Sequence, residues 1–101
     1  MELKELEQRM HNFVTSKGWY EADSPKVQSP RNLAISLALE AAEILEHFQW
    51  GDEVADLSAL AGELADISLY LLQLASVSGV DLEQAILDKL AQNQLREWPD
   101  P

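Results

Sequence analysis

Two pairs of acidic residues lie in the two most apolar stretches of this 101-residue chain. Glu40 and Glu43 belong to "LALEAAEILEHFQW", and Glu63 and Asp66 belong to "AGELADISLYLLQLA", so each pair has an i, i+3 spacing. Carboxylates gathered in a partly dry cleft repel one another and take up protons unless a cation neutralises them. No Lys or Arg occurs at residues 32–88, so these segments offer no side-chain cation.

An all-oxygen ligand set of this kind selects hard divalent cations. We therefore expect the four acids to bind Mg²⁺, which Mn²⁺ can replace, with Ca²⁺ a further alternative. Mg²⁺ usually keeps several waters and takes substrate phosphates as further ligands. A di-iron carboxylate site is the rival, but such sites use Glu-x-x-His pairs, and neither His11 nor His47 follows a Glu at that spacing. We expect His47 to lie at the surface or to contact a ligating carboxylate.

The spacing of these acids indicates which surface of each helix carries them. Each pair lies on a polar stripe whose members recur at intervals of four and three residues, which is the spacing of an inward-facing helical surface. A single Glu-x-x-Glu on a helix is most often a solvated face, but two such pairs on inward stripes without basic neighbours favour a metal site. If the two helices pack antiparallel, the stripes face each other and the four carboxylates converge. The first polar stripe is Ser36, Glu40, Glu43, His47 and Trp50, and the second polar stripe is Ala59, Glu63, Asp66, Tyr70 and Gln73.

Hydrophobic periodicity predicts four helices, over 2–16, from 30 or 31 to about 49, over 53–78 and over 82–95. Residues 17–30 contain one Gly and two Pro without any period and are expected to form a loop. Gly51 is expected to cap the second helix, and Asp81, with Gln84 three residues on, to cap the fourth. No strand pattern is present, so the sequence predicts one all-α domain over 1–101, an antiparallel four-helix bundle with short connections.

Composition excludes several classes of protein. Without cysteine the chain has neither disulfides nor a thiolate zinc site. A net charge of -11 argues against a nucleic-acid polymer as partner. The charged start "MELKELEQRM" does not resemble a signal peptide, and we expect no apolar run to approach the roughly 20 residues of a membrane span. These features predict a cytoplasmic protein without a membrane partner, and its widely apolar helices predict a homodimer or homotetramer.

The same residues carry a resemblance to a known family. "PRNLAISLALEAAEILEHFQW" followed by "GELADISLYLLQLA" resembles the all-α nucleoside triphosphate pyrophosphohydrolases of the MazG-like superfamily, above all the dCTP pyrophosphatase branch. The resemblance covers about Pro30 to Pro99 and combines both acidic pairs with the "FQW" at residues 48–50. It implies Mg²⁺-dependent hydrolysis of a (deoxy)nucleoside triphosphate between the α and β phosphates. It also implies that the four acids are both metal ligands and catalytic, that dCTP or a modified dCTP is the substrate, and that the role is nucleotide-pool control.

The resemblance also implies a set of substrate-binding residues. Basic and amide groups at helix ends suit phosphate contact, and aromatic rings suit stacking on a base. Gln28 stands where related dCTP enzymes have histidine, and Trp19 lies in a longer loop than theirs. The structural alternatives are an ordinary helix-end charge for the basic groups and bundle core for the aromatics. The implied residues are Trp19, Gln28, Arg31, Trp50, Tyr70, Lys89 and Asn93.

One alternative function stays open from the sequence. The chain could be a non-catalytic helical interaction module whose acidic cleft serves solubility, metal binding or contact with a partner. A specific ligand of the folded state raises the melting temperature further as its concentration increases above Kd. Melting curves with and without Mg²⁺ and nucleotide therefore discriminate between the two functions.

Overall fold

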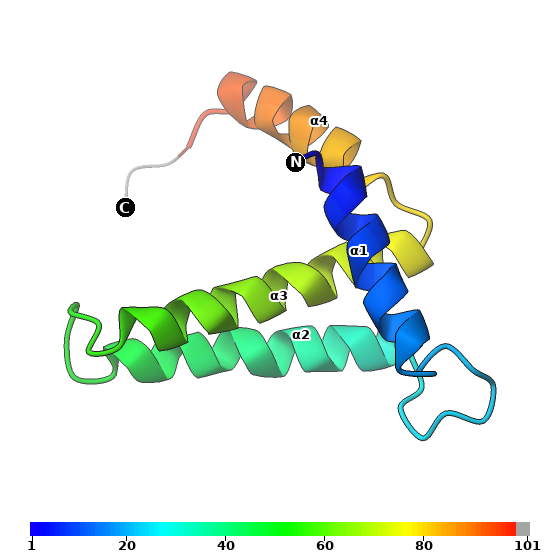
Figure 1. Ribbon diagram of the computed structural model, residues 1–101. Coiled ribbons are helices and arrows are strands. Elements are labelled where there is room, and N and C mark those ends of the chain that lie inside the picture. The colour runs from blue at the N-terminus through cyan, green and yellow to red at the C-terminus, as the bar shows by residue number, and fades with distance from the viewer. Residues whose placement is uncertain (99–101) are drawn as a thin grey trace.

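A computed structural model describes residues 1–98, and within that range the chain is helical without strands (Figure 1). The all-α class and the four α-helices of the prediction are thereby confirmed. Residues 99–101, which the predicted domain and resemblance include in whole or part, lie outside the described residues. The helices are α1 (Leu3–Ser16), α2 (Pro30–Ile44), the short 3₁₀ helix η1 (Leu45–Phe48), α3 (Leu57–Val77) and α4 (Leu82–Leu95).

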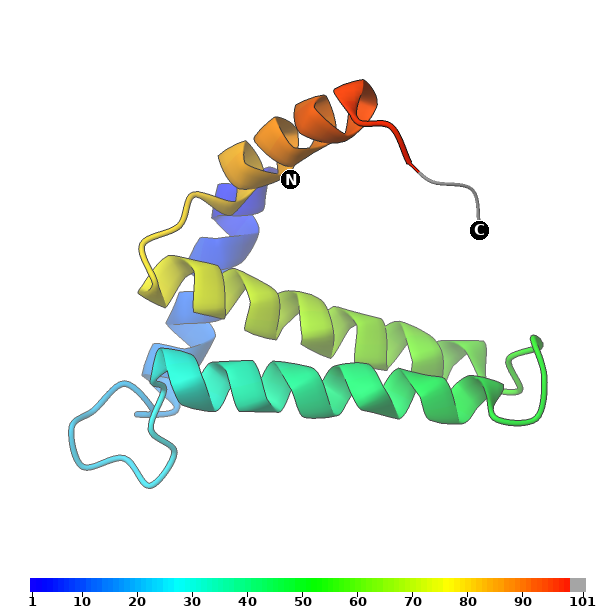
Figure 2. The same ribbon diagram turned by 180° about the vertical axis from the view of Figure 1, so that it is seen from behind.

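Helices α2 and α3 form a long antiparallel hairpin, seen side by side in both views (Figures 1 and 2). The Ser29 hydroxyl accepts a hydrogen bond from the Asn32 N–H at 3.2 Å, and Pro30 occupies the first turn, where its missing N–H costs nothing. At the other end the helix tightens into η1. Helical structure thus ends at Phe48, one residue before the predicted end, and Gly51 follows with a φ of 154°.

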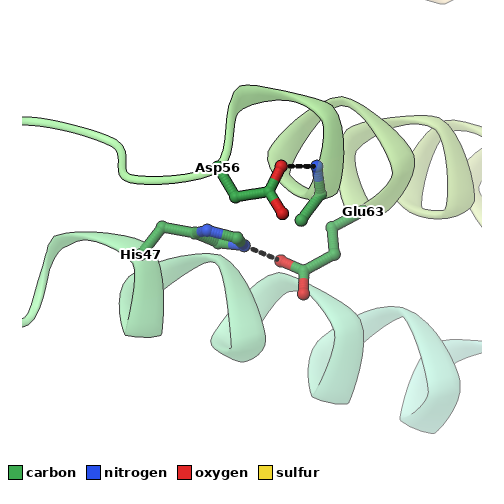
Figure 3. A network of polar contacts seen from close by, with 4 residues as sticks. His47, Asp56 and Glu63 are labelled. Atoms are coloured by element: carbon green, nitrogen blue, oxygen red, sulfur yellow. Dashed lines mark hydrogen bonds and ion pairs between the residues drawn. The ribbon is translucent and has the colours of Figure 1, made fainter.

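Helix α3 begins at Leu57, four residues later than the prediction of 53. The Asp56 carboxylate accepts a hydrogen bond from the Ala59 N–H at 3.0 Å and fixes this start (Figure 3). The helix ends at Val77, and Gly79 adopts the left-handed conformation at φ 76° just beyond it. The sequence "DEVADLS" continues the helical pattern back to Glu53, so periodicity alone placed the start too early.

Helix α1 crosses the hairpin at the end where α2 begins and α3 stops (Figure 2). The small core lies at this crossing. Met10 and Val14 of α1 are buried against Leu72 of α3. Trp19 of the following loop and Leu82 at the start of α4 pack on the same cluster. The core therefore fixes the 17–29 loop beside the α2–α3 hairpin.

Helix α4 starts as predicted, because the Asp81 carboxylate accepts a hydrogen bond from the Gln84 N–H at 3.1 Å. The reciprocal half of the predicted capping box is replaced: the Gln84 amide donates to Asp88 at 2.8 Å instead. The helix stands apart from the hairpin in both views (Figures 1 and 2). Of its residues only Leu82 and Asn93 are half-buried, and the others are exposed. One chain by itself thus packs three of its four helices together.

The single chain is more open than a folded monomer of its size. Its radius of gyration is 16.3 Å, whereas a compact 100-residue domain has about 13 Å. Its accessible surface is 7909 Å², against about 5,700 Å² from the surface–mass relation for a monomer of 11.3 kDa. Much of the excess is apolar side chain on α2, α3 and α4.

Helix α3 corrects one expectation about apolar runs. It has 21 residues, and its most apolar 18-residue window has a mean hydropathy of 1.3, which by length and composition alone suffices to cross a membrane. The expectation that no run approaches this length is therefore wrong. The helix also packs antiparallel to α2 and carries Glu63 and Asp66, so its apolar character equally suits contacts between helices.

Candidate functional site

Glu40 of α2 lies close enough to Glu43, Glu63 and Asp66 for their charges to act on it, and Glu43 and Asp66 are exposed to solvent. The convergence of all four acids in one inward-facing cleft stays a prediction. Half-buried Glu40 on α2 has a raised pKa, first because burial disfavours its charge and then because the charges of Glu43, Asp66 and Glu63 repel it. A hydrogen bond with Glu43 raises the pKa further. Since Glu63 and Asp66 belong to α3, Glu40 experiences carboxylates from both helices.

Lys and Arg side chains of residues 1–98 do not neutralise the acidic cluster of Glu40, Glu43, Glu63 and Asp66. Within residues 1–98 no Lys or Arg forms an ion pair with any of the four acids. A polar partner from outside the cluster is His47 of η1, whose Nε2 lies 2.8 Å from Oε2 of Glu63 (Figure 3). The side chains are 15% and 26% exposed, so the contact is largely shielded from water. His47 thus contacts one of the predicted ligands, which is the second of the two positions expected for it.

The chemistry of these donors fits a hard divalent cation. Four carboxylates without a basic counter-charge form the all-oxygen set that Mg²⁺ and Mn²⁺ prefer. In the described part of the chain, no three His, Asp or Glu side chains are already gathered as a ready ligand set. The assignment of Glu40, Glu43, Glu63 and Asp66 as metal ligands therefore stays a prediction, supported by donor type and mutual repulsion.

A cavity of about 700 Å³ opens beside Glu40 and Asp66. Its walls come from α1, the 17–29 loop and the facing sides of α2 and α3. The volume lies within the roughly 300–1,000 Å³ of small-molecule sites. Of the predicted substrate residues, Trp19, Gln28 and Tyr70 line this cavity together with the two acids.

Four predicted substrate residues lie elsewhere in the single chain. Trp50 follows η1 at the far tip of the hairpin and is 92% exposed. Arg31 is exposed at the start of α2 and does not line the cavity. Lys89 and Asn93 belong to α4, which stands apart from the hairpin. Asn93 has a buried Oδ1 with no hydrogen-bond partner in the part of the chain described. A role for these four residues in substrate binding stays a prediction.

Two basic residues that the sequence analysis did not identify also line the cavity. They are Arg9 of α1 and Lys26 of the loop. The Lys26 ammonium lies 4.7 Å from the ring centroid of Trp19, which is cation–π distance. Nothing in the local pattern marks either residue, because Arg9 reaches the cavity through the packing of α1 on the hairpin and Lys26 through the path of the 17–29 loop.

A hydrogen-bond network ties the 17–29 loop to α1 and α3. Gln73 on α3 donates from Nε2 to the Tyr20 hydroxyl at 3.2 Å and to Oε1 of Gln28 at 2.7 Å. His11 of α1 bridges Tyr20 and Ser76, with both contacts at 2.6 Å. Burial raises the pKa of Tyr20, and the Gln73 hydrogen bond offsets part of that rise. The phenol therefore keeps its proton at neutral pH and can donate it to His11.

Comparison with known proteins settles the family. Residues 35–100 match the MazG-like family, and this match includes all four acids. The chain belongs to the MazG-like family. Among curated proteins, this MazG-like chain is 35% identical to "dCTP pyrophosphatase 1" of Mus musculus over 98 residues. It is 38% identical to the Bos taurus protein of the same name. Each alignment covers 87% of this chain and 55% of the relative, so the chain spans about half the length of these relatives.

A solved structure extends the comparison to the fold of nearly the whole MazG-like chain. The crystal structure of a pyrophosphatase from Archaeoglobus fulgidus DSM 4304 superposes with a TM-score of 0.74 at 32% sequence identity. The superposition covers 97% of this chain and 93% of the archaeal one. The arrangement of helices described above is therefore shared with a protein of similar length.

Proposed function

We propose that this protein is a Mg²⁺-dependent nucleoside triphosphate pyrophosphohydrolase. It would cleave a (deoxy)nucleoside triphosphate between the α and β phosphates and release a monophosphate and pyrophosphate. The observation that carries the proposal is the position of Glu40 near carboxylates of both helices, with no Lys or Arg partner within residues 1–98, beside a cavity of nucleotide size. Membership of the MazG-like family and the names of the relatives support the same reaction.

The four acids would hold Mg²⁺, or Mn²⁺ in its place. When bound, the metal supplies charge neutralisation for the phosphates and lowers the pKa of a water molecule for attack. The acids then no longer repel an anionic substrate, because the metal inverts the local field. His47 would orient Glu63 through the 2.8 Å contact. The chain thus contributes the ligand charges, their alignment and the shape of the cleft.

The cavity would receive the base and sugar. Trp19 and Tyr70 present aromatic surface for stacking, and Gln28 offers amide groups to the polar edge of a base. Arg9 and Lys26 add positive charge at the same walls. We propose dCTP or a modified dCTP as the substrate, in line with the names of the mammalian relatives, and control of the cytoplasmic nucleotide pool as the purpose.

The active form would be a homodimer or homotetramer. The surface excess of about 2,200 Å² over a compact monomer exceeds the about 800 Å² that each partner buries in a standard interface. On α4, Leu87 and Leu90 are each 54% exposed, and a second copy would cover them. Lys89 and Asn93 on this same helix would then contribute to a neighbour's site.

A nucleotide panel tests the proposed function. The purified protein is incubated with each standard nucleoside and deoxynucleoside triphosphate, with Mg²⁺ and in a metal-free control. The products are separated by ion exchange. Monophosphate and pyrophosphate in equal amounts are expected only with the metal, and the fastest nucleotide identifies the base. An absence of turnover with every nucleotide, while Mg²⁺ alone raises the melting temperature, would favour the non-catalytic alternative.

A further inference from the structure

Gln73 is the one buried polar residue within residues 1–98, with only 4% of its surface exposed. It lies on α3, among buried Leu72 and Ala75, and continues the second polar stripe beyond Asp66 and Tyr70. A buried amide carries a cost unless its donors are satisfied. Both Nε2 hydrogens of Gln73 have partners, and both partners belong to the 17–29 loop.

Both partners of Gln73 are connected to Trp19. Tyr20, which accepts the first hydrogen bond, is the next residue after Trp19. Gln28, which accepts the second, donates from its own Nε2 to the Lys26 carbonyl at 2.8 Å. The Lys26 ammonium in turn lies 4.7 Å from the Trp19 ring centroid. Gln73 therefore adds two hydrogen bonds to the packing of Trp19 on Phe13 and the core, and these bonds set the polar part of the loop at the cavity wall.

We propose that Gln73 is a positioning residue that sets the loop carrying Trp19 and Gln28 against the cavity and thereby determines nucleotide affinity and base selectivity. The inference rests on the proposed function for what the cavity binds. The acids of the first polar stripe make none of these hydrogen bonds. Loss of the two Gln73 hydrogen bonds therefore acts on substrate binding and leaves the four acids in place.

Gln73→Leu tests this directly, because leucine is of similar size and makes neither hydrogen bond. KM for the preferred nucleotide is expected to rise about 5- to 30-fold, the range for losing one or two hydrogen bonds of ordinary net strength. The preference for that nucleotide over the second best should fall, while kcat and the Mg²⁺ dependence stay close to wild type. Combining Gln73→Leu with Gln28→Ala should cost less than the two single changes together, since both remove the same bond.

A second readout needs no catalysis. Trypsin cleaves after Lys17 and Lys26, which lie within the loop that Gln73 fixes. Cleavage at both sites should be faster in Gln73→Leu than in wild type, and unchanged in the matched control Gln8→Leu on the exposed side of α1. If Gln73→Leu does not fold, Tyr20→Phe is the smaller change, and it removes one of the two Gln73 bonds together with the His11–Tyr20 contact.

The outcomes separate this inference from the proposed function. Wild-type protein without turnover overturns the function, and the proteolysis comparison still tests the two Gln73 hydrogen bonds. Unchanged KM, selectivity and cleavage in Gln73→Leu overturn the positioning role. A fall in kcat at constant KM also overturns it, because the residue would then act on the reaction and not on the cavity wall.

Discussion

Nε2 of His47 lies 2.8 Å from Oε2 of Glu63 and joins the end of the α2–η1 segment to α3 (Figure 3). A group that holds a ligating carboxylate in place typically contributes 10- to 100-fold to metal affinity. We therefore expect His47→Asn to weaken Mg²⁺ binding by about this factor with little change in helix content. Titration calorimetry with Mg²⁺, or Mn²⁺ as a spectroscopic substitute, measures the change. Glu46→Gln, an exposed neighbour, is the control, and equal affinity in both variants would contradict the role of His47.

The raised pKa of Glu40 predicts how stability depends on pH in the metal-free protein. Burial and the neighbouring carboxylates raise the pKa in the folded state, so the folded chain holds this proton at a pH where the unfolded chain has lost it. The free energy of unfolding should therefore decrease as the pH rises from the ordinary carboxyl range through the raised value. Glu40→Gln should flatten this dependence and raise the melting temperature at neutral pH in EDTA.

Urea unfolding at a series of pH values in EDTA checks this expectation, again with Glu46→Gln as the control. Added Mg²⁺ should restore stability to the wild type at neutral pH and do less for Glu40→Gln. An unchanged pH profile in Glu40→Gln would show that the four carboxylates do not repel one another as described.

The Asp56 cap gives a prediction about the helix that carries Glu63 and Asp66. Its carboxylate accepts the Ala59 N–H at 3.0 Å (Figure 3). Asp56→Ala should destabilise the protein by about 1 kcal/mol, the usual effect of losing an N-cap. For a domain of this size the melting temperature should fall by about 4–8 °C. Asp52→Ala, in the exposed turn before the cap, should change it by much less, and a similar loss in both variants would remove the cap as the cause.

Much of this fold follows from local sequence. Pro30 marks the start of α2, and Asp81 caps α4 as its position suggests. Glu40 lies near Glu63 and Asp66 because helical periodicity places these residues on the sides of α2 and α3 that face each other. The start of α3 was missed because "DEVADLS" satisfies the apolar period on both sides of the Asp56 cap, and only the cap contact decides between them.

The cavity depends on contacts between distant segments and was foreseen only in part. Lys26 reaches it because the 17–29 loop folds back over α1, and no local pattern encodes that path. Trp50 and Lys89 lie away from the cavity because, within residues 1–98, Trp50 is exposed at the tip of the hairpin and α4 packs on the rest only at its start, through Leu82. In the proposed assembly, their roles would depend on a second copy. A single sequence indicates such a copy only through its exposed apolar residues.

Exposed leucines on α4 predict the behaviour of the protein in solution. Sedimentation equilibrium should give two or four times the chain mass of 11.3 kDa. Leu87→Glu combined with Leu90→Glu should shift the mass toward the monomer, because the interface would have to bury unpaired charges. Gln92→Glu on the same helix adds the same kind of charge and serves as the control. A wild-type protein that sediments as a monomer would contradict the proposed assembly.

The most direct test of the central claim is the identity of the products from dCTP in wild type and in the ligand variants Glu43→Gln and Asp66→Asn. Removing one carboxylate charge from the cluster should abolish turnover while circular dichroism shows the fold intact. Wild type with Mg²⁺ should give dCMP and pyrophosphate in equal amounts, and none in EDTA. Formation of dCDP and phosphate, hydrolysis without metal, or full activity in both variants would contradict the assignment of these acids as the metal-dependent catalytic centre.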